Sequence, residues 1–93
     1  MRVLCMTYRL YAPWVKSLKE KRMIIQSLMA QLRNRFHVSA AEIGEQNSHY
    51  MILIGIASVI PHQAVADRLS EEIYRFIESL TDAAIIEETK EIR

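Results

Sequence analysis

Lysine and arginine residues gather in the first third of the chain, and their chemistry is the clearest that this sequence offers. Residues 1–35 hold eight Lys or Arg against one acid, whereas residues 36–93 hold four against ten acids. Flexible cations beside the start of a helix suit phosphate oxygens. We therefore take as a candidate nucleic-acid or anion site the cluster Lys16, Lys19, Lys21, Arg22, Arg33 and Arg35. An ordinary solvated helix face accounts for the same residues equally well.

The remaining reactive side chains do not combine into a catalytic or metal centre. Cys5 has no histidine near it in the sequence, which favours a small core residue over a nucleophile. Hairpin pairing separates His37 from His49 by about 23 Å, and His62 has no Cys or acidic ligand at a usual spacing. Glu42 is explained as well by a salt bridge between subunits as by catalysis. With two glycines in the chain there is no phosphate-binding loop, so we expect no catalytic, cofactor-binding or metal-ligating residues.

Two helices and four strands must position these side chains. Alternating or continuous apolar runs predict strands over residues 3–11, 37–43, 49–59 and 83–92. The capping-box pattern from Ser17 to Glu20 begins a helix that runs to about Arg35. Pro61 suits the first turn of a second helix, which the three- and four-residue apolar spacing carries to Leu80.

The element order β-α-β-β-α-β predicts an α+β fold. Right-handed crossovers in that order give a four-stranded antiparallel sheet with strand order 4-1-3-2 and both helices on one face, a ferredoxin-like sandwich. Strands 1 and 3 are then central, which agrees with their apolar character on both faces. Ninety-three residues fit one domain, spanning 1–93.

A second copy of the chain is the simplest cover for the sheet face without helices. A domain of this size has a thin margin of stability, which pairing of subunits increases. We expect a homodimer or a larger homo-oligomer whose interface includes Leu4, Met6, Tyr8, Tyr50, Ile52 and Ile54.

The sequence also indicates where the protein is found. A single cysteine cannot form an intramolecular disulfide, and Met1 leads into a strand pattern with no long apolar signal core. The longest uncharged apolar run, about Tyr50 to Val59, is half of the roughly 20 residues that span a bilayer as a helix. We expect a cytoplasmic protein with no membrane contact.

Four short blocks along the chain are similar to the YlxP-like bacterial family, a domain of unknown function numbered 503. The blocks are Ser17-Leu18-Lys19-Glu20-Lys21-Arg22, Asn34-Arg35-Phe36-His37-Val38-Ser39, Ala41-Glu42-Ile43-Gly44 and Gly55-Ile56-Ala57. The resemblance implies a ferredoxin-like fold, an unknown activity, and a link to ribosomes or RNA through neighbouring translation genes. Members commonly carry Gln-Asp-x-Trp-Gln-Arg in the hairpin, where this chain has Gln46-Asn47-Ser48-His49-Tyr50-Met51.

Three functions remain open at this point. The leading hypothesis is a non-enzymatic binding domain that contacts RNA or a ribosomal partner through the basic first helix. The alternative is a protein-interaction role as a homo-oligomer, with no contact to nucleic acid. An enzyme is the third, and it requires a concave polar pocket around Cys5 or Glu42.

Overall fold

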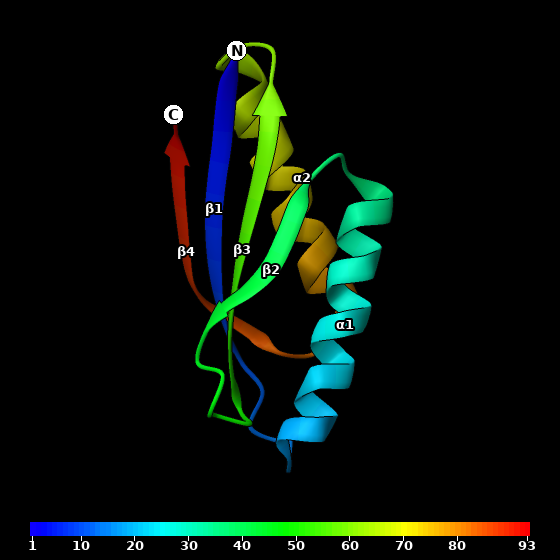
Figure 1. Ribbon diagram of the computed structural model, residues 1–93. Helices are drawn as coiled ribbons and strands as arrows, with labels where there is room; N and C mark the ends of the chain where they lie inside the picture. The colour runs from blue at the N-terminus through cyan, green and yellow to red at the C-terminus, as the bar shows by residue number, and fades with distance from the viewer.

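Two helices cover one face of a four-stranded antiparallel sheet in the computed structural model, which describes residues 1–93 (Figure 1). The strand order is β2-β3-β1-β4, the predicted order read from the other edge. The α+β, ferredoxin-like prediction is therefore confirmed. In chain order the elements are β1 Arg2–Tyr11, α1 Leu18–Arg35, β2 Ser39–Gly44, β3 Met51–Ile60, α2 Ala64–Leu80 and β4 Ala84–Ile92.

The central strands β1 and β3 alternate between the helices and the opposite side of the sheet. The even-numbered residues from Leu4 to Leu10 and from Ile52 to Ile60 are buried beneath α1 and α2. They form most of the sheet's share of a core of 19 buried residues. The odd-numbered residues point the other way and keep partial exposure, because no segment of the chain covers that side.

The residues predicted for a subunit interface were chosen from the wrong face. Five of them are at most 1% exposed because the helices of the same chain cover them: Leu4, Met6, Tyr8, Ile52 and Ile54. The sixth, Tyr50, precedes β3 and is 46% exposed, and its ring meets that of Tyr11 edge to face. A second copy cannot reach the five buried side chains without displacing the helices.

Local sequence signals explain where the helices begin. The Ser17 hydroxyl accepts a hydrogen bond from the amide of Glu20, as the capping-box pattern predicts. The Glu20 carboxylate accepts from the amide of Lys16, one residue earlier than expected. Helix α2 begins at Ala64, three residues after Pro61, and its N-cap Gln63 makes no side-chain hydrogen bond.

The loop between β2 and β3, residues 45–50, begins with a turn whose first residue has a left-handed backbone conformation. Glu45 has φ 58°, the only positive φ in the chain, and the Ser48 amide donates to the Glu45 carbonyl. A shift in pairing register between Glu42 and Gly44 bends the end of β2.

Neither helix holds an apolar stretch of the length needed to cross a membrane.

Candidate functional site

The exposed side of α1 carries a row of cations. Lys19, Arg22 and Arg33 recur at three-, four- and seven-residue steps with Gln26 between them, so they share one side of the helix. All of them are exposed. From Lys19 to Arg33 the row extends about 21 Å at 1.5 Å per residue. Lys16 extends it in the turn before the helix. We call Lys16, Lys19, Arg22, Arg33 and Arg35 the α1 cations.

Lys21 does not belong to this surface, which corrects the predicted cluster. Its side chain is 2% exposed, and its ammonium group donates to the carbonyl oxygens of Glu45 and Ser48, each at 2.6 Å. Its Nζ also lies 3.2 Å from Oε2 of Glu42. Lys21 therefore ties α1 to the β2–β3 hairpin. The sequence held the signal, since Lys21 lies four residues before Ile25 and seven before Leu28, within the apolar stripe of the helix.

Glu42 is explained by the same contact. It lies in β2 on the side of the sheet that faces α1, opposite the buried Ile54. Its Oε2 is buried with no hydrogen bond of good geometry, and Lys21 is the one cation within reach. The ion pair is internal to the chain, so neither catalysis nor a salt bridge between subunits is needed to account for this carboxylate.

Two of the α1 cations lie at the far end of the helix from the others. Arg33 donates from Nη2 to the carbonyl of Ala40, and the Arg35 guanidinium lies 5.9 Å from the centre of the Phe36 ring. Both side chains remain exposed. Since an 18-residue helix is about 27 Å long, Lys16 and Arg35 lie at opposite ends of it, and Arg35, two residues after Arg33, points to a different side of the helix from the row.

The α1 cations differ from most other Lys and Arg side chains in having no carboxylate partner. Six cations lie within 4.0 Å of a carboxylate: Arg9, Lys21, Arg68, Arg75, Lys90 and Arg93. Of the six that do not, five are the α1 cations and the sixth is Arg2. The unneutralised positive charge of the protein is therefore concentrated along α1.

The cysteine and the histidines are far from forming a reactive group. Cys5 lies on the helix-free side of the sheet and is partly exposed. His49 places Nδ1 2.6 Å from the carbonyl of Val15 and so helps to hold the hairpin against the turn before α1. No three His, Cys, Asp or Glu side chains converge as metal ligands would.

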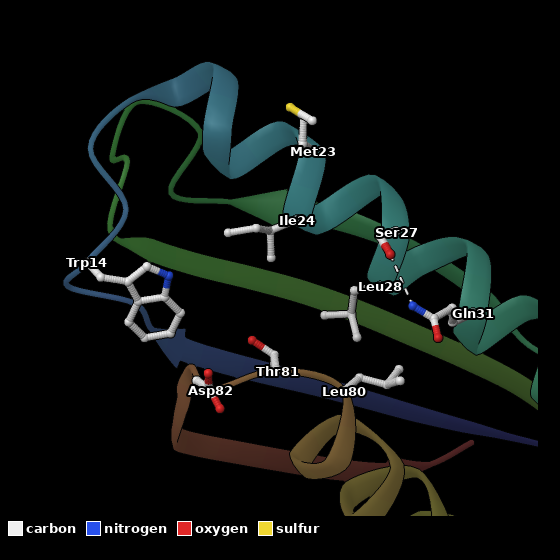
Figure 2. Close-up of a pocket in the computed structure, with 9 residues that line it drawn as sticks. All are labelled: Trp14, Met23, Ile24, Ser27, Leu28, Gln31, Leu80, Thr81 and Asp82. Carbon is white, nitrogen blue, oxygen red and sulfur yellow. Dashed lines mark hydrogen bonds between the residues drawn. The ribbon is translucent and has the colours of Figure 1, made fainter.

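A cleft between α1 and the end of α2 is a feature that the sequence did not reveal. It encloses about 400 Å³. Figure 2 shows Ile24, Leu28 and Leu80 directed into it, with Trp14 and Asp82 toward one end. Trp14 is 43% exposed. The lining includes one carboxylate and no His, Cys or Lys, so it lacks the paired groups of general acid–base catalysis.

A buried tyrosine joins the core to β4. The Tyr8 hydroxyl donates to Oε2 of Glu88 at 2.7 Å. Burial raises the pKa of Tyr8 far above its usual 10.0, and the hydrogen bond to Glu88, the Glu88 charge and Tyr74 act in the same direction. The native protein therefore retains this proton at a pH where the unfolded chain releases it.

Alkaline pH is expected to destabilise the protein through Tyr8. Because the native pKa is the higher one, the contribution of Tyr8 is complete below about pH 10 and is lost as the pH rises, by at most about 1.4 kcal/mol per pH unit. Urea unfolding at a series of alkaline pH values, for wild type and Tyr8→Phe, measures this loss. The wild-type free energy of unfolding should fall more steeply, and parallel curves for the two proteins would contradict the assignment.

Comparison with known proteins is decisive about the family. The family model described as "Protein of unknown function (DUF503)" matches residues 3–90. The chain belongs to the DUF503 family. It is also similar to the "Uncharacterized protein YlxP" of Bacillus subtilis (strain 168), with 32% identity over 66 residues that cover 71% of this chain and 72% of that protein. The resemblance to YlxP-like proteins expected from the sequence blocks is thus confirmed.

In this DUF503 protein the residues of the β2–β3 hairpin have a structural role. The Ser48 carbonyl accepts from the Lys21 ammonium group, and the Tyr50 carbonyl accepts from the amide of Ala12. His49, at the position where the family pattern has tryptophan, contacts Val15 and packs edge to face on Tyr50. These residues bind the hairpin to the rest of the chain and are not arranged around a reactive group.

Proposed function

We propose that this DUF503 protein is a non-enzymatic binding domain that contacts RNA through the α1 cations. The observation that carries the proposal is the pairing pattern of its charges: apart from Arg2, the other cations of the chain lie within 4.0 Å of a carboxylate, and the α1 cations do not. A lone acid, Glu20, lies within the helix, and its carboxylate is engaged by the Lys16 amide. Such a surface attracts a polyanion with little internal competition.

The geometry favours contact with phosphates rather than with bases. Lysine and arginine side chains spaced along about 21 Å of helix can follow several consecutive phosphates of a nucleic-acid backbone. The Arg35 guanidinium lies 5.9 Å from the centre of the Phe36 ring at the C-terminal end of α1. No row of exposed aromatic side chains, on which unpaired bases stack, accompanies the cations. We therefore expect strong dependence on salt and little dependence on RNA sequence.

The test is the salt dependence of binding to purified ribosomal RNA. Each phosphate contact contributes roughly −0.7 to −0.9 to the slope of log affinity against log salt concentration. Replacing Lys19, Arg22 and Arg33 by alanine should make that slope shallower by about 2 to 3 and weaken binding at low salt. Lys21 is left in place, because its loss would disturb the hairpin.

The matched control removes the same charge from cations that are already paired. Replacing Arg68, Arg75 and Arg93 by alanine changes the net charge equally, but each of these side chains has a carboxylate partner in the chain. This variant should keep the wild-type salt slope. Equal slopes for the two triple variants, or no binding by wild type at low salt, would overturn the RNA-binding role of α1.

A further inference from the structure

The side of the sheet turned away from the helices is apolar at its centre and is covered by no part of the chain (Figure 1). We call it the open face. All four strands contribute to it. Its residues are Val3, Cys5, Thr7 and Arg9 in β1, Ser39, Ala41 and Ile43 in β2, Met51, Leu53, Gly55, Ala57 and Val59 in β3, and Glu87, Thr89 and Glu91 in β4 with Arg93 just after it. The charged residues of these strands lie along the β1 and β4 side, and Glu45 of the β2–β3 hairpin reaches Arg9 at one end, so an apolar area is bordered by a polar one, as in protein interfaces.

Both cations of the open face are paired with carboxylates of the same chain. Arg9 lies 3.2 Å from the carboxylate of Glu45 and 3.5 Å from that of Glu87, and Arg93 lies 2.9 Å from that of Glu91. Two such faces therefore meet with no unpaired cation between them. The α1 surface, by contrast, would repel a copy of itself, because its cations are not neutralised.

The centre of the open face has room for a side chain from another molecule. Small residues, Ala41, Gly55 and Ala57, border a shallow hollow of about 360 Å³ that also reaches Cys5. Ile43 stands beside it, 52% exposed, with Cγ2 3.0 Å from the position that a Cβ on Gly55 would take. In a two-fold contact the exposed aliphatic side chain of each copy can enter the hollow of the other, so the same contact is made twice.

We infer that two copies of this chain associate face to face through their open faces. The ten-residue strands β1 and β3 are about 33 Å long, β2 and β4 are shorter, and four strands span about 15 to 19 Å, so each copy contributes at most on the order of 500–600 Å². The total of about 1,000–1,200 Å² lies at the low end of specific interfaces and predicts a dimer that dissociates on dilution. This association is independent of the proposed RNA contact, because α1 lies on the other side of the sheet.

Sedimentation velocity between about 1 and about 300 μM tests the dimer, since small interfaces are typical of weak, transient association. Wild type should shift from monomer to dimer as its concentration rises, whereas Ile43→Glu should stay monomeric because its new carboxylate would be buried between the copies. Met23→Glu, on α1 and 64% exposed, makes the same apolar-to-acid change away from the open face and should dimerise as wild type does. Far-UV circular dichroism confirms that both variants are folded.

Cys5 supplies a second measurement that does not depend on a variant. Its thiol lies on the open face, so its reaction with a maleimide should become several-fold slower as the protein concentration rises through the dimerisation range. Wild type that remains monomeric at the highest concentration, or an Ile43→Glu variant that dimerises like wild type, would overturn the inference. The Lys19/Arg22/Arg33 to alanine variant should still dimerise, so loss of RNA binding and loss of dimerisation are distinguishable.

Discussion

Replacing Lys21 by methionine is expected to lower the free energy of unfolding by about 3 kcal/mol, because removing one partner of a buried pair leaves the other charge without compensation. The variant keeps the length of the side chain but leaves Glu42 without its cation and two hairpin carbonyls without their donor. We expect the lower end of the usual range, since the Glu42 side chain is 22% exposed and is partly solvated. Urea or thermal unfolding measures the change.

Lys19→Met is the matched control for this prediction. Lys19 lies on the same helix but is exposed and has no carboxylate partner, so its replacement should change stability by no more than about 0.5 kcal/mol. Combining Lys21→Met with Glu42→Gln should recover part of the loss, because the unpaired charge is then removed as well. Backbone amides of residues 45–48 should exchange with solvent faster in Lys21→Met. Equal stability of the two single variants would show that Lys21 does not hold the hairpin.

Replacing Ile54 by alanine is expected to cost 2 to 5 kcal/mol, the usual range for deleting a fully buried aliphatic side chain that leaves a cavity. Ile54 is 0% exposed at the centre of β3, between its partners Tyr8 in β1 and Glu42 in β2. Its strand is held on both sides, so the surrounding backbone has little freedom to collapse into the space. Chemical unfolding at a protein concentration of a few μM gives the free energy.

Ile86→Ala makes the identical chemical change at a different depth. Ile86 lies in β4 at the point where the pairing register with β1 shifts, and it is 51% exposed. Its truncation should cost under about 1 kcal/mol. Similar losses for Ile54→Ala and Ile86→Ala would contradict the assignment of Ile54 to the core beneath the helices.

The order of the elements and of the strands could be predicted because it depends on the spacing of apolar residues, which can be read directly from the sequence. The capping box before α1, the apolar spacing in both helices and the long apolar run of β3 each indicate one type of element. Right-handed crossover connections then leave one sheet order for this sequence of elements. The starts of β2, β3 and α2 differ from the predicted ones by two or three residues, where Pro61, the hairpin and the short residues of β2 give weak signals.

The side of the sheet that the helices cover could not be predicted in the same way. In the first half of β1 one face carries Leu4 and Met6 and the other carries Val3 and Cys5, so both faces are apolar in composition. Alternation shows that two faces exist, but not which one the helices cover. The open face was therefore mistaken for the core face, and the interface was assigned to buried residues.

Lys21 was misassigned for a related reason. A lysine is grouped by its charge with neighbouring cations when only the sequence is available, although its spacing from Ile25 and Leu28 places it on the buried stripe. What decides its role is the acceptor set formed by Glu42 and two hairpin carbonyls, which come from residues more than twenty positions later. Long-range contacts of this kind are outside the reach of a local pattern.

The central position of β1 also determines the order in which the fold can be assembled. The first strand of the chain pairs with β3, where Arg2 lies opposite Ile60, and with β4, where Leu4 lies opposite Ile92. Both ladders close long loops of chain, which costs entropy before either contact forms and slows folding relative to helical proteins of similar length. During synthesis both edges of the apolar strand β1 therefore stay unpaired until most of the polypeptide has been made. Chaperone protection of the nascent chain matters most during this interval.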